Sequence, residues 1–137
     1  MIITSMGLPR EIRERLFCRH VLLDCADQPT RSCPSGCHAV HDEVLTEFLA
    51  FCASNQTLRR AAGLAVSRLV NAPDIRILPQ SRNSFLDGLA LYNARPDKGY
   101  SLTDCISMQT MRREGLTAVL TNDRHFEQEG FRALFRF

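Results

Sequence analysis

No stretch of this 137-residue chain comes near the roughly 20 consecutive apolar residues that a membrane-spanning helix needs. The N-terminus also lacks the basic, apolar and small-residue order of a signal peptide. A Ser-His-Asp order, a glycine-rich phosphate loop and an HExxH run are missing as well. These absences argue against a membrane protein and against three common enzyme classes, and they favour a cytoplasmic protein.

Lysine is also scarce, because Lys98 is the only lysine among 17 basic residues. Arginine suits phosphate oxygens, but a strong arginine bias is equally typical of a GC-rich coding sequence. The net charge of +2 permits an anionic partner without requiring one. With 45% hydrophobic and 23% charged residues, the chain has the balance of a globular protein, and we expect one domain over residues 1–137.

Cysteines are unevenly distributed: four of the six lie within the first 37 residues. Without a secretory signal, a disulfide framework is not expected. Cys25, Cys33, Cys37 and His38, with His41 nearby, offer an alternative as a zinc-stabilised module. Their spacing departs from the usual two-residue knuckle, and no second paired half follows.

Regular periodicity begins at residue 42, whereas residues 1–40 are atypical and carry no long amphipathic pattern. Helices alternating with short apolar strands indicate βαβ units, so we expect an α/β domain with a parallel sheet. Predicted helices cover 42–54, 57–70, 84–93, 101–114 and 123–128, and predicted strands cover 75–78, 116–120 and 132–135. Expected inward residues are Val44, Leu45, Phe48, Leu49 and Cys52 in the first helix, and Phe85, Leu86, Leu89 and Tyr92 in the third.

Two aspartates occupy positions where a parallel sheet would bring them to one edge. Asp104 lies three residues after Ser101, which by itself indicates a capping box at a helix N-terminus. Asp123 follows the apolar strand Ala118-Val119-Leu120, and by itself it indicates an N-cap. In open α/β sheets, however, ligands bind beyond the carboxyl ends of the strands.

Glu47 has the ordinary interpretation of a solvated helix residue, but it lies on the flank of its helix's apolar face. Three carboxylates that met at one edge would favour Mg²⁺ or Mn²⁺, which prefer oxygen ligands. Such ions activate water and neutralise the charge of a phosphodiester. His125 is expected as a helix-surface or capping residue, with contact to a substrate as the alternative.

Three segments, taken in their order and spacing, resemble the PIN domain family, in particular the small stand-alone type that includes toxins of prokaryotic toxin–antitoxin pairs. They are Val44-Leu45-Thr46-Glu47-Phe48-Leu49, the run from Arg95 to Cys105 that contains Ser101-Leu102-Thr103-Asp104, and Leu120-Thr121-Asn122-Asp123-Arg124-His125-Phe126. The resemblance covers about residues 40–135. It implies a three-layer α/β/α fold with a central parallel sheet.

The resemblance also implies an Mg²⁺- or Mn²⁺-dependent endonuclease, usually acting on RNA. Glu47, Asp104 and Asp123 match the second, third and fourth acidic positions of the family and are expected to hold the metal and act in catalysis. Thr121, Asn122 and Arg124 are expected near the substrate. The implied partners are RNA, an antitoxin protein and a second copy of the chain. Other candidate phosphate contacts are Arg82, Arg95, Lys98, Arg112 and Arg113.

The chain departs from the family pattern at the first acidic position, normally an Asp that ends the opening strand. Asp24 is the candidate, with His20 to Asp24 as the strand, but only 22 residues separate it from Glu47. A displaced reading frame over roughly the first 38 residues is one hypothesis, and truncation or divergence is another. Since a ligand would be lost, a catalytically impaired PIN-like protein that binds RNA or a partner is the alternative function.

Overall fold

Within the described residues, five strands form one sheet in the order β3-β2-β1-β4-β5. The computed structural model describes residues 38–134 and the backbone of residues 22–24. The strands are β1 (Leu22–Asp24), β2 (His38–His41), β3 (Ile75–Leu78), β4 (Ala118–Leu120) and β5 (Arg132–Ala133). The helices are α3 (Asp42–Cys52), α4 (Gln56–Val70), α5 (Arg82–Ala94), α6 (Leu102–Glu114) and α7 (Arg124–Gln128).

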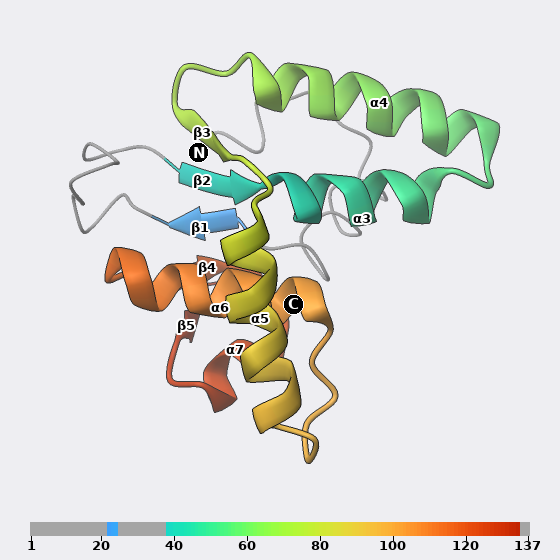
Figure 1. Cartoon of the computed structure of the whole chain (residues 1–137). Helices are drawn as coiled ribbons and strands as arrows, with labels where there is room; N and C mark the ends of the chain where they lie inside the picture. The colour runs from blue at the N-terminus through green and yellow to red at the C-terminus, as the bar shows by residue number, and fades with distance from the viewer. Residues whose placement is uncertain (1–21, 25–37, 135–137) are drawn as a thin grey trace.

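Helices cover both faces of this sheet, which gives the expected α/β/α layers (Figure 1). Successive strand residues point to opposite faces, so Ala39 and Val40 of β2 belong to different hydrophobic clusters. Val40 joins the cluster of α3 and α4, which includes Phe48 and Leu69. Ala39 joins residues of α5, α6 and α7. The two clusters are therefore the two interlayer cores.

The direction of β1 differs from the expected parallel opening strand. β2 pairs with β3 and β4 pairs with β5 in parallel, but β1 is antiparallel to both β2 and β4. In this register Asp24 pairs with His38 and Ala118, the first residues of β2 and β4. A strand at the predicted place thus fills the middle of the sheet, but its carboxyl end lies at the opposite edge from theirs.

Local sequence signals place most helix boundaries. Ser101 caps α6 through a capping box with Asp104, and Gly115 ends that helix with φ of 71°, a conformation that suits glycine. Asn55 caps α4, and Asp123 caps α7. Helix α3 begins at Asp42 as predicted, but Asp42 does not cap it, because the N-cap position is His41.

The predicted inward face of α5 is only partly correct, because Phe85 and Leu89 are half-buried but the other two residues are exposed. Its buried residues are Ser84, Gly88 and Leu91, whereas Leu86 and Tyr92 are 44% and 48% exposed. Gly88 lies so close to α6 that an added Cβ would come within 2.4 Å of Ile106 Cγ1. Close helix packing over small residues, rather than burial of the largest ones, therefore selects this face. In α3 the prediction is correct except for Leu49, which is 36% exposed.

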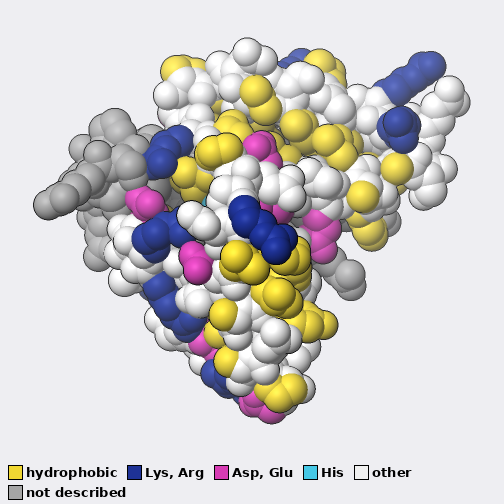
Figure 2. All heavy atoms as spheres, in the orientation of Figure 1, with side chains coloured by type: hydrophobic (Ala, Val, Ile, Leu, Met, Phe, Trp, Pro, Cys, Tyr) yellow, Lys and Arg dark blue, Asp and Glu magenta, His cyan; other side chains and the backbone are white. Residues whose placement is uncertain are grey.

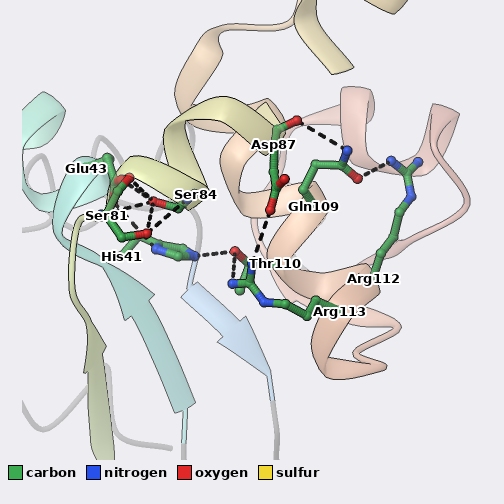
Figure 3. A network of polar contacts seen from close by, with 9 residues as sticks. All are labelled: His41, Glu43, Ser81, Ser84, Asp87, Gln109, Thr110, Arg112 and Arg113. Carbon is green, nitrogen blue, oxygen red and sulfur yellow. Dashed lines mark hydrogen bonds and ion pairs between the residues drawn. The ribbon is translucent and has the colours of Figure 1, made fainter. Parts of the chain in front are cut away.

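A polar network joins β2 and α3 to α5 and α6 (Figure 3). The buried His41 Nε2 lies 2.8 Å from Thr110 Oγ1, and Ser84 Oγ donates to Glu43 Oε1 at 3.2 Å. Burial lowers the pKa of His41, although Glu43 opposes this effect. His41 is therefore held neutral as part of the fold. The cysteines of the alternative zinc module lie outside the described residues.

The molecular surface combines charge with scattered apolar side chains. Figure 2 shows hydrophobic side chains over α4 and α5, and the exposed large ones include Leu64, Val70 and Leu86. Within the described residues, no helix has the length and apolar character that crossing a membrane requires.

Candidate active site

A cleft of about 590 Å³ opens where β4 ends and α6 begins. All three predicted carboxylates, Glu47, Asp104 and Asp123, line it. They come from α3, the first turn of α6 and the residue that caps α7, so segments distant in sequence converge here. The other lining residues are Gly99, Ser101, Asn122, Arg124 and His125.

The capping box of α6 fixes Asp104 rigidly. Ser101 N–H donates to Asp104 Oδ2 at 2.9 Å, and Asp104 N–H donates to Ser101 Oγ at 3.1 Å. The residue is only 7% exposed. Burial raises the pKa of Asp104, Asp123 and Glu47 raise it further, and the hydrogen bonds from Ser101 partly oppose them. The capping role and the place in the cleft are thus both present.

Asp123 is positioned by its neighbours on both sides. Its N–H donates to Thr121 Oγ1 at 3.1 Å, and its Oδ1 accepts the His125 N–H at 2.9 Å. Thr121 itself is fully buried and does not line the cleft. Thr121 therefore supports the turn that carries Asp123, while Asn122 and Arg124 line the cleft.

Most of the basic residues predicted as phosphate contacts are paired with carboxylates of the protein. Arg95 Nη1 lies 2.6 Å from the buried Glu129 Oε1, and Arg112 pairs with the same carboxylate. Arg113 contacts Asp87 and Thr110, and Lys98 lies 3.6 Å from Asp97. In the described part of the chain, Arg124 is the only one of these candidates that lines the cleft.

Asp24 is not brought to this cleft by the backbone register. It pairs with the first residue of β4, whereas Asp123 follows the last residue of that strand by three positions. The hypothesis that Asp24 supplies the first acidic ligand therefore gains no support, because the strand that carries it runs in the reverse direction. The segments before and after β1 lie outside the described residues.

The donor set fits a hard or borderline divalent cation. One ligand atom from each of Asp104, Asp123 and His125 lies within 4.8 Å of the others. The raised pKa of Asp104 reflects a carboxylate crowded by burial and by like charge, which a bound cation would relieve. A cysteine nucleophile is not supported, because burial and Asp104 raise the pKa of Cys105 to about 11.

The α/β/α fold and the acidic side chains gathered beyond the end of β4 together define the class: an α/β protein with a candidate cation site. Residues 35–131 match the PIN domain family, and since this is more than half of the chain, the protein belongs to the PIN domain family. Among solved structures, the chain is similar to VapC20 of Mycobacterium tuberculosis, described as a Sarcin-Ricin loop cleaving toxin. That similarity has a TM-score of 0.61 and 20% identity, and covers 68% of this chain and 70% of VapC20. No curated protein sequence matches the chain.

Proposed function

We propose that this chain is a metal-dependent endoribonuclease that hydrolyses RNA phosphodiester bonds. The observation that carries the proposal is the convergence of Glu47, Asp104 and Asp123 in one cleft of a PIN domain. Membership of that family, and the similarity to VapC20, a Sarcin-Ricin loop cleaving toxin, support RNA as the substrate class.

Each side chain of the cleft has a role that follows from its position. Asp104 and Asp123 would hold Mg²⁺ or Mn²⁺, with the exposed Glu47 at the same cleft. The bound cation would supply water activation and neutralise phosphate charge. Arg124 attracts the phosphate backbone to the cleft, and Asn122 offers amide and carbonyl groups to the substrate. Thr121 and Ser101 hold the two aspartates in place.

Cleavage of a labelled RNA by the purified chain tests this proposal. We expect cleavage that depends on Mn²⁺ or Mg²⁺ and that EDTA abolishes, with a DNA of the same sequence cut more slowly. Asp104→Asn and Asp123→Asn should each reduce the rate on the order of 10²-fold or more. Asp87→Asn is the matched control, because its carboxylate is 54% exposed on α5 and outside the cleft. Equal rates for all variants would contradict the proposal.

A catalytically impaired PIN protein that binds RNA or a partner is the second candidate. The reversed β1 favours it, because the backbone register places Asp24 at the edge of the sheet away from the carboxyl end of β4. Calorimetry separates the two functions: retained RNA affinity with no Mn²⁺ binding supports the impaired form. An antitoxin partner and a homodimer remain predictions, and copurification with the product of an adjacent small gene would test the first.

A further inference from the structure

His125 lines the cleft and is held there by its neighbours, which the predicted role of a helix-surface residue does not explain. It is the second residue of α7, and its ring meets Tyr100 edge-on with ring centroids 5.2 Å apart. An ideal Cβ on Gly99 would lie 3.7 Å from His125 Nε2, so the ring also lies against the loop before α6. Two neighbours therefore hold the imidazole in one orientation at the cleft wall.

One ring nitrogen of His125 lies beside an aspartate of the cleft. His125 Nδ1 lies 3.1 Å from Asp123 Oδ1, yet this atom is inaccessible to solvent and makes no well-aligned hydrogen bond. The Asp123 oxygen already accepts the backbone N–H of His125. A buried ring nitrogen without a hydrogen-bond partner costs free energy unless something else satisfies it.

Two carboxylates and this imidazole form a group of possible metal ligands. Asp104, Asp123 and His125 each offer a ligand atom within 4.8 Å of the other two. Mg²⁺ selects oxygen ligands almost exclusively, whereas imidazole nitrogen suits first-row transition metals, with Mn²⁺ accepting both kinds of donor.

We propose that His125 is a nitrogen ligand of the cation, together with Asp104 and Asp123, and that it makes this site prefer Mn²⁺ to Mg²⁺. This inference rests on the proposed function, because it concerns the same cleft. A ligand from His125 would compensate in part for Asp24, whose backbone the register places at the other edge of the sheet. A neutral donor also adds no negative charge to a centre where like charge already raises the pKa of Asp104.

Electron paramagnetic resonance of Mn²⁺ bound to the full chain tests the ligand directly. A directly bound imidazole gives a ¹⁴N hyperfine coupling, which should change when histidine is labelled with ¹⁵N and should vanish in His125→Gln. The measurement on the wild-type chain needs no variant, so the proposal stays testable even if a substitution impairs folding.

Calorimetry with Mn²⁺ and with Mg²⁺, each alone, provides the second readout. We expect His125→Gln to weaken Mn²⁺ binding by about 10–100-fold and Mg²⁺ binding by less than about threefold. His125→Asp, which restores an oxygen ligand, should shift the preference back toward Mg²⁺.

The outcomes distinguish the two proposals. Mn²⁺ binding without ¹⁴N coupling, and with an unchanged Mn²⁺ to Mg²⁺ ratio in His125→Gln, overturns the role of His125 and leaves the nuclease proposal standing. Failure of the wild-type chain to bind Mn²⁺ at all overturns both.

Discussion

Ser101 has two roles, because it caps α6 and also orients Asp104 in the cleft. Its hydroxyl accepts the Asp104 N–H at 3.1 Å, so it both caps the helix and sets the first turn that carries the carboxylate. The same residue also lines the cleft. A loss of this hydroxyl should therefore affect stability and cation binding together.

We expect Ser101→Ala to lower the free energy of unfolding by ~1 kcal/mol, the usual cost of an N-cap. We also expect it to weaken Mn²⁺ binding by roughly tenfold, because Asp104 loses part of the support that orients it. Urea denaturation and calorimetry measure the two effects.

Ser81→Ala is the matched control for this prediction. Ser81 forms a capping box with Ser84 at the start of α5, where its hydroxyl accepts the Ser84 N–H at 3.0 Å. Its loss should cost a similar free energy of unfolding and leave Mn²⁺ affinity unchanged. If both substitutions weakened Mn²⁺ binding equally, the effect would reflect general stability and not the orientation of Asp104.

At the scale of elements, α5 packs closely against α6, the helix whose first turn carries Asp104. Gly88 makes this contact possible, because an added Cβ would come within 3.1 Å of the Ile106 backbone nitrogen as well as within 2.4 Å of its side chain. Backbone atoms cannot rotate away as the end of a side chain can, so the two helices would have to move apart.

We expect Gly88→Ala to destabilise the fold by roughly 1–3 kcal/mol through overpacking, although alanine is the better helix former. Gly63→Ala in α4 is the control, since an added Cβ there meets nothing within 4 Å. That substitution should stabilise the fold by roughly 0.5–1 kcal/mol. Chemical denaturation of both variants checks the opposite signs, and a stabilising Gly88→Ala would show that α5 can shift freely on α6.

The same contact explains where sequence periodicity fails. Periodicity ranks residues by size and polarity, so it selected Leu86 and Tyr92 for the core, while close approach of two helices buried Ser84 and Gly88 instead. Caps are different, because their chemistry is local: Ser101 and Gly115 bound α6 as the sequence predicts.

Strand β2 was missed for a related reason. Its sequence, His-Ala-Val-His, has no apolar run, and its burial depends on a partner far along the chain. The buried His41 has a hydrogen-bond partner for its ring nitrogen only because Thr110, 69 residues away, lies beside it. Glu47, Asp104 and Asp123 could be proposed from the sequence, because the segments around them have the order and spacing of the PIN family. The placement of His125 beside two of them could be seen only in the structure.

For the whole molecule, the direction of β1 is the feature that the sequence could not supply. Leu22, Leu23 and Asp24 suit a central strand in either direction, because hydrogen bonds to both neighbours form whether the pairing is parallel or antiparallel. Direction nevertheless decides at which edge of the sheet the backbone of Asp24 lies. A sheet can thus be complete in its hydrogen bonding while the strand that carries Asp24 ends away from the described cleft.

At the scale of the whole molecule, the buried Asp104 should lower the stability of the cation-free fold while it provides a ligand for a cation. Burial raises the pKa of Asp104, and Asp123 and Glu47 raise it further, so its ionised form opposes folding when no cation is present. We therefore expect Asp104→Asn to stabilise the cation-free chain at neutral pH by roughly 0.5–2 kcal/mol, the range of single stabilising substitutions. The sign with pH follows from the same shift. Since the folded-state pKa lies above 3.8, the difference between wild type and Asp104→Asn should shrink as pH falls through that folded-state pKa toward 3.8.

Saturating Mn²⁺ should reverse the order of stability. A cation at 100 times its dissociation constant stabilises a folded chain by about 2.7 kcal/mol, and Asp104→Asn should gain little of this. Thermal melts with EDTA and with Mn²⁺, at neutral pH and near pH 4, measure all four states. Wild type should melt below Asp104→Asn in EDTA and above it in Mn²⁺. A wild-type chain that melts higher in both would mean that Asp104 serves the fold alone, because a carboxylate kept for a cation must cost stability until the cation arrives.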